Sequence, residues 1–160
     1  MHKFSVWLDA DSFPVKARSF LVTHAFSKQV PIFFVANHEI KADSSKVKMI
    51  ICEKGKDVAD NYIFEHACQN DIVLTRDVLF ASRLVEKNIT VMNDRGVLFS
   101  KDNIGDKLRE REFSLNMSEI GFGAGKGNYY GEKEFKKFST LFEQELQKHI
   151  IADIYNIPRR

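Results

Sequence analysis

Cysteine is scarce in this sequence, with only Cys52 and Cys68 among 160 residues. Both lie in apolar or helical contexts, and neither has the paired spacing of a thiolate zinc site. Two cysteines are also too few for the disulfide scaffold of a small secreted domain. We therefore expect two buried free thiols in a reducing compartment.

Long hydrophobic runs and a large excess of either charge are missing as well. The first apolar run reaches Asp9 after a few residues, which is too short for the core of a signal peptide, and no run is long enough to span a bilayer. Lysine and arginine total 24 against 22 acidic residues, so the net charge of +2 identifies no nucleic-acid or membrane partner. We expect a cytoplasmic protein without a membrane, and any nucleic-acid function must depend on local features.

The sequence does contain enough apolar residues for one core. They make up 44% of a chain whose length is typical of one domain. We expect a single domain over residues 1–150, followed by a frayed C-terminal tail at 151–160.

Short apolar runs alternate along the chain with amphipathic stretches. The runs are rich in β-branched and aromatic residues and predict strands at 4–8, 32–36, 47–52, 72–74 and 89–92, with an extra edge strand at 97–99. The amphipathic stretches predict helices at 15–26, 58–68, 78–87, 102–117 and 132–149. The polar segment 37–46 predicts a loop. This alternation predicts an α/β three-layer sandwich with a mostly parallel central sheet of the Rossmannoid kind.

Two aspartates, Asp9 and Asp11, follow the first predicted strand. Alternation of side chains along a strand would point both the same way. The carboxyl ends of parallel strands border the crevice where ligands bind in open α/β sheets. The alternative is that Asp11 or Ser12 caps the helix that begins near Pro14, which would leave Asp9 unexplained.

Three more aspartates stand at predicted helix starts. Asp57 and Asp60 are three residues apart and share one helix face, and Asp77 follows the strand at 72–74. Each of them could equally cap a helix, because acidic residues favour helix N-termini. A functional site requires that the order of strands in the sheet bring these separate ends together.

If the five aspartates meet, their mutual repulsion would raise at least one pKa unless cations compensate. A hard divalent ion, Mg²⁺ or Mn²⁺, is the expected compensation, and paired ions can clamp both oxygens of a phosphodiester. The set lacks cysteine and histidine at metal-binding spacing, which argues against zinc. The predicted metal ligands are Asp9, Asp11, Asp57, Asp60 and Asp77, with Asp9, Asp11 and Asp77 as catalytic residues.

Five further polar residues lie just beyond predicted strand ends. Lys16, Arg76 and Arg95 could bind phosphate, although each could instead be solvated or offset a nearby aspartate. Asn37 and Asn93 could orient water or a nucleotide, although asparagine is also a common turn residue. We take all five as candidate substrate-binding residues.

The glycine-rich stretch 121–127 resembles a phosphate loop only superficially. Ile120 stands where the first glycine of that motif belongs, and Gly127 stands where serine or threonine belongs. Lys126, Tyr129 and Tyr130 could instead contact a nucleic-acid backbone and stack on bases, or the stretch could simply be a linker.

Five motifs in order along the chain resemble the YaiI/YqxD protein family over about residues 4–145. They are Leu8–Val15, Val35–Asn37, Asp57–Asp60, Asp71–Asp77 and Asn93–Gly96. The resemblance implies a PIN-like nuclease fold, in which clustered acids at the sheet edge bind magnesium or manganese and cleave RNA. Carried over residue by residue, it implies the same five aspartates as the metal site.

The leading hypothesis is therefore a metal-dependent phosphodiesterase, ribonuclease-like, that acts on RNA through the aspartates. The alternative is an RNA- or nucleotide-binding module that uses the same acidic crevice without turnover. A third possibility is an interaction protein whose acidic edge binds a basic partner without metal.

Overall fold

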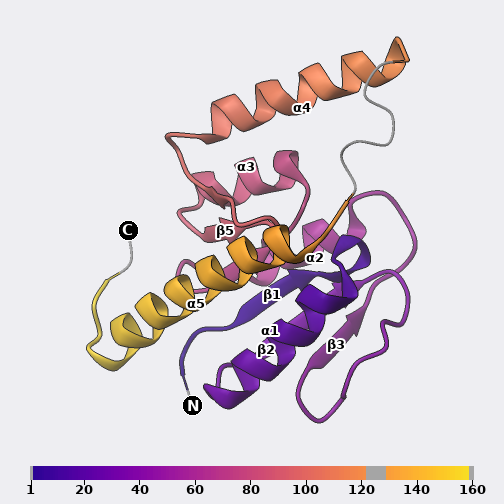
Figure 1. The fold of residues 1–160 in the computed structure, drawn as a ribbon. Coiled ribbons are helices and arrows are strands. Elements are labelled where there is room, and N and C mark those ends of the chain that lie inside the picture. The colour runs from indigo at the N-terminus through magenta and orange to yellow at the C-terminus, as the bar shows by residue number, and fades with distance from the viewer. Residues whose placement is uncertain (1, 122–128, 159–160) are drawn as a thin grey trace.

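The computed structural model describes residues 2–121 and 129–158, which form an α/β three-layer sandwich (Figure 1). Its sheet has six strands: β1 (Val6–Asp9), β2 (Ile32–Ala36), β3 (Lys48–Ile51), β4 (Ile72–Leu74), β5 (Thr90–Met92) and β6 (Leu98–Phe99). Its helices are the short 3₁₀ turn η1 (Ala10–Ser12), α1 (Val15–Ser27), α2 (Val58–His66), α3 (Val78–Glu86), α4 (Ile104–Glu119) and α5 (Glu132–Ile154). The predicted strand–helix alternation is confirmed.

The strand order is β3-β2-β1-β4-β5-β6. The first five strands are parallel to their neighbours, and β6 pairs antiparallel with β5, so the predicted edge strand is confirmed. The chain builds outward from β1 to β3 and then crosses to β4 on the other side of β1. This crossing makes β1 and β4 neighbours, and in such a sheet ligands bind at the carboxyl ends of the strands that flank the reversal.

Two apolar cores lie on the two faces of the sheet. Alternate strand residues such as Leu8 and Leu74 pack with α1 and α5, whose Phe138 and Phe142 are fully buried. The intervening residues such as Val73 pack with α2 and α3. The two cores provide the three layers, and α4 extends beside α3, with its residues half-buried or exposed (Figure 1).

The prediction that both cysteines are buried is wrong. Cys52 is half-buried and Cys68 is exposed, although both are free thiols. Helix α2 ends at His66, before the predicted end at residue 68, and the backbone N–H of Cys68 donates instead to the carboxylate of Asp71 (2.9 Å). Cys68 therefore lies in the turn before β4, outside the packed face of the helix.

Helix α5 is longer than predicted and continues to Ile154, into the segment taken as tail. The carboxylate of Asp153 in its last turn binds His2 Nδ1 at 2.8 Å. Contacts with the N-terminal segment thus hold the end of this helix. Within the described residues, none of the helices combines the length and the apolar character that a bilayer span requires.

Candidate metal centre

The candidate site lies where β1 and β4 end side by side. Leu8 and Leu74 are the last aligned pair of these strands, so Asp9 and Thr75 come next to each other beyond it. Thr75, which is fully buried, donates a hydrogen bond from Oγ1 to Oδ2 of Asp9 at 3.0 Å. Asp9 is itself only 8% exposed, so its carboxylate is held below the surface at the edge of the sheet.

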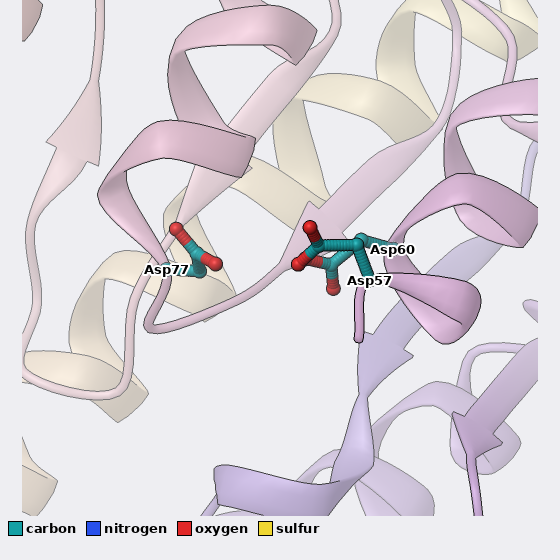
Figure 2. Close-up of side chains that lie close together, drawn as sticks. All are labelled: Asp57, Asp60 and Asp77. Atoms are coloured by element: carbon teal, nitrogen blue, oxygen red, sulfur yellow. The ribbon is translucent and has the colours of Figure 1, made fainter. Parts of the chain in front are cut away.

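Three other aspartates converge beside this pair. Carboxylate oxygens of Asp57, Asp60 and Asp77 all lie within 4.8 Å of one another. Figure 2 shows the carboxyl groups of Asp57 and Asp60, from the start of α2, turned toward Asp77 at the start of α3. Helix α2 is the connection that crosses from β3 to β4, so the crossing brings its N-terminus to this point. The predicted meeting of separate helix ends is therefore observed for these three residues.

Asp57 adopts a backbone conformation that few residues other than glycine take. Its φ of 62° lies in the left-handed region, which aspartate and asparagine adopt more readily than other residues with a Cβ. Its side chain makes no capping hydrogen bond to α2, so the alternative explanation of Asp57 as a helix cap does not account for the carboxylate.

Asp77 does cap a helix, and it also belongs to the cluster. Its Oδ1 accepts from the backbone N–H of Phe80 at 3.2 Å, as expected for an N-cap. Its own backbone N–H donates to Thr75 Oγ1 at 3.1 Å. The two explanations proposed for Asp77 are therefore compatible, and Thr75 connects it directly to Asp9.

The electrostatics of the cluster favour protonation. Burial, the charges of Asp9, Asp77 and Asp57, and a hydrogen bond with Asp9 raise the pKa of Asp60 from 3.8 to about 7. Burial raises the pKa of Asp9 to about 6, aided by the charges of Asp11 and Asp77 and opposed by hydrogen bonds from Thr75 and Asp60. Because burial and the neighbouring charges disfavour ionisation of both carboxyls, Asp9 and Asp60 are expected to share a proton near neutral pH.

Asp11 is oriented differently from the other aspartates. Strand β1 ends at Asp9 and the chain turns into η1, so strand alternation does not extend to Asp11. Its carboxylate accepts from the backbone N–H of Asn37 (3.2 Å) and lies 3.0 Å from His38 Nδ1. Asp11 does not cap α1, whose N-cap is Pro14. It contributes charge beside Asp9 and contacts the loop after β2.

Arg76 is engaged in a buried charge pair. Its Nε lies 3.3 Å from Oδ2 of Asp94, a carboxylate only 1% exposed, and its guanidinium donates to the carbonyl of Ser12 at 3.1 Å. Burial raises the pKa of Asp94, and the charge of Arg76 opposes that rise. The pair anchors Arg76 across the ends of β1, β4 and β5, with a third of its side chain exposed.

The other predicted substrate-binding residues have structural partners. Lys16 pairs with Glu132 of α5. Arg95 donates to the carbonyl of Tyr129 at 2.7 Å. Asn93 Oδ1 accepts from the backbone N–H groups of Arg95 (2.9 Å) and Val97 (3.0 Å), so it forms the turn that was its alternative explanation. Residues 122–128, including Lys126, lie outside the described part of the chain.

Sequence reasoning missed Thr75. The sequence feature that could have identified Thr75 is its position directly after the strand at 72–74, which corresponds to the position of Asp9 after the neighbouring strand. That register becomes visible only once β1 and β4 are known to be adjacent.

Comparison with known proteins identifies relatives along almost the whole chain. The family model described as "Uncharacterized BCR, YaiI/YqxD family" matches residues 7–148. A UPF0178 protein of Treponema denticola is 37% identical over 143 residues, covering 89% of this chain and 92% of the relative. UPF0178 proteins of Psychromonas ingrahamii (37% over 145 residues; 90% and 96%) and Syntrophobacter fumaroxidans (35% over 144 residues; 89% and 94%) are similarly close. No solved structure matches the chain significantly.

Proposed function

The chain belongs to the YaiI/YqxD family, and we propose that it is a divalent-metal-dependent phosphodiesterase that cleaves RNA. The observation that carries the proposal is the convergence of the Asp57, Asp60 and Asp77 carboxylates within 4.8 Å, with the buried Asp9 close enough that its charge raises the pKa of Asp60. The ion would be Mg²⁺ or Mn²⁺.

The residues present fit such an ion. All the donors are carboxylate oxygens, which hard divalent cations prefer. Two oxygens on one magnesium ion lie at most about 4.2 Å apart, since each bond is roughly 2.1 Å long. Separations of up to 4.8 Å therefore allow one ion after small side-chain movements, or two ions that share ligands.

Charge supports the same conclusion. Burying several carboxylates together is unfavourable unless they are protonated or neutralised, and the raised pKa values of Asp9 and Asp60 express that cost. A cation would lower both pKa values and displace the proton that Asp9 and Asp60 share. Binding of the ion is therefore expected to release protons and to strengthen as pH rises through about 6 to 7.

A bound divalent ion would supply an activated water and neutralise charge on the phosphate. The carboxylates of Asp57, Asp60 and Asp77 would hold the ion, while the Thr75 hydroxyl orients Asp9. Arg76 stands beside Asp77 in the chain, held by Asp94, and would contact a phosphate of the substrate. Asp11 contacts the loop after β2 and would add negative charge beside Asp9.

The test is Asp9→Asn, which preserves shape and removes one charge. We expect Mn²⁺ affinity, measured by calorimetric titration, to fall by at least about tenfold, because even residues behind a metal ligand contribute 10–100-fold. Manganese-dependent cleavage of a mixed RNA pool should be lost with it. Asp102→Asn, at an exposed position before α4, is the matched control.

Unchanged Mn²⁺ affinity in Asp9→Asn would contradict the role of Asp9. Wild-type protein that binds RNA but does not cleave it, with or without manganese, would favour the alternative of a non-catalytic RNA- or nucleotide-binding module.

A further inference from the structure

One part of the sheet is left uncovered on the face that carries the aspartates. Strand β3 lies at the edge, and its four residues are half-buried or exposed, whereas all four residues of β1 are buried. Helix α2 has only nine residues and packs over β1 and β2. Phe33 of β2 and Ile50 of β3 pack against the core on this face but stay half-buried.

Four aromatic rings form a continuous array beside this edge. Phe33 stacks on Trp7 with ring centroids 4.3 Å apart and planes 12° apart. Tyr62 stacks on His66 at 4.0 Å and 17°, and both lie 6.4 Å from Trp7. Trp7 is only 6% exposed, but Phe33 and Tyr62 are half-buried and His66 is exposed. We call Phe33, Tyr62 and His66 the aromatic platform.

Lysines border the aromatic platform on the side of β3. Lys48 Nζ lies over the ring of Phe33, 5.3 Å from its centroid. Residues 46–56, which form β3 and its flanks, contain four lysines and a single acidic residue, Glu53. This basic segment leads directly into Asp57 and the candidate metal centre.

We propose that the aromatic platform binds the bases of single-stranded RNA while the lysines of residues 46–56 contact its phosphates. Aromatic rings accept stacked bases of any sequence, and a basic border attracts the backbone. Single strands fit better than duplexes because their bases are free to stack on side chains. The inference deepens the proposed function, because it gives the RNA a binding surface beyond the phosphate to be cleaved.

Continuity with the metal centre supports this assignment. Helix α2 carries Asp57 and Asp60 at its start and Tyr62 and His66 in its later turns, so even the most distant pair, Asp57 and His66, is separated by only roughly 13 Å along the helix. A strand whose bases lie on the aromatic platform can therefore reach the aspartates within a few nucleotides.

The experiment measures RNA binding in EDTA, so that it does not depend on a metal. The probe is a fluorescein-labelled 12-nucleotide oligouridine, followed by anisotropy. We expect Tyr62→Leu and His66→Ala each to weaken binding by about tenfold, in line with the loss of one stacked base. Tyr155→Leu, which removes an exposed tyrosine just beyond α5, should leave binding unchanged.

Two further measurements address the same surface. Trp7 is the only tryptophan, so its emission should change when oligouridine binds to the aromatic platform, whose Phe33 and Tyr62 contact it. Lys48→Gln should reduce the dependence of log Kd on log salt concentration by about 0.7, whereas Lys101→Gln, at an exposed position before α4, should not.

The inference is overturned if folded Tyr62→Leu and His66→Ala variants bind oligouridine as wild type does, or if Trp7 emission is unaffected. It is also overturned if size-exclusion chromatography shows a dimer that Tyr62→Leu dissociates, because the surface would then be an interface between copies. Asp60→Asn should retain RNA binding in EDTA, which separates failure of the metal centre from failure of the aromatic platform.

Discussion

Replacing Asp60 with asparagine should make the metal-free protein more stable at pH 8. The rise in its pKa from 3.8 to about 7 means that ionised Asp60 is disfavoured in the folded state. Asparagine keeps the shape, can still donate to Asp9, and carries no charge. The full rise would correspond to about 4 kcal/mol; sharing of the proton with Asp9 and relaxation of the neighbouring carboxylates reduce this to an expected gain of about 1–2 kcal/mol.

The sign of the pH dependence follows from linkage. A carboxyl with a raised folded pKa binds its proton more tightly in the folded state, so wild-type stability falls as pH rises from about 3.8 to about 7. Below pH 3.8 the protonated aspartate resembles asparagine and the two proteins should be equally stable. The advantage of Asp60→Asn should therefore grow between pH 4 and 7 and then level off.

The assay is urea unfolding in EDTA at a series of pH values, with Asp102→Asn as the exposed control. In thermal unfolding the gain should appear as about 2–4 °C per kcal/mol. On addition of Mn²⁺, wild type should gain stability by ligand binding and Asp60→Asn should not. A variant that is less stable than wild type at pH 8, or a difference that does not change with pH, would refute the electrostatic reasoning.

The remaining predictions concern positioning and backbone geometry. Thr75→Val removes the hydroxyl that binds Asp9 and Asp77; it should raise the pKa of Asp9 and weaken Mn²⁺ binding in a calorimetric titration, and Thr75→Ser should restore both. An intact Mn²⁺ affinity in Thr75→Val would show that the link is dispensable. Gly96→Ala should destabilise by more than about 2 kcal/mol in urea unfolding, because φ is +81° and a Cβ would lie 2.8 Å from the main chain of Lys137. Gly121→Ala, with φ +88° and nothing within 4 Å, should cost only about 1 kcal/mol; equal losses in the two variants would contradict the steric argument.

Most secondary structure was predictable because its causes are local. The run Ile72–Leu74 and the periodic apolar positions of α3 were visible in the sequence, and both elements form as expected. Helix ends were less accurate where tertiary contacts decide them. Helix α2 ends early, where the backbone N–H of Cys68 donates to the carboxylate of Asp71. Helix α5 continues further than predicted, and Asp153 in its last turn contacts His2 near the N-terminus.

The candidate site was predictable in part. The placement of Asp9 after a strand and of Asp57 and Asp60 at a helix start was apparent from the sequence. The role of the Thr75 hydroxyl was not apparent from the sequence, since it depends on which strand lies beside β1. The turn of Asp11 toward Asn37 was also hidden, because a 3₁₀ turn interrupts the strand alternation there.

The sequence by itself determined the kind of fold, the acidic residues and the family, because these depend on composition, periodicity and motifs along the chain. Only the tertiary structure decided which acids meet. The placement of β4 beside β1 brings together carboxylates from three separate segments and raises the pKa values of Asp9 and Asp60. The edge position of β3 and the shortness of α2 leave the aromatic platform uncovered. Those properties depend on the distances between residues that are far apart in the chain, and these distances are determined only when the chain folds.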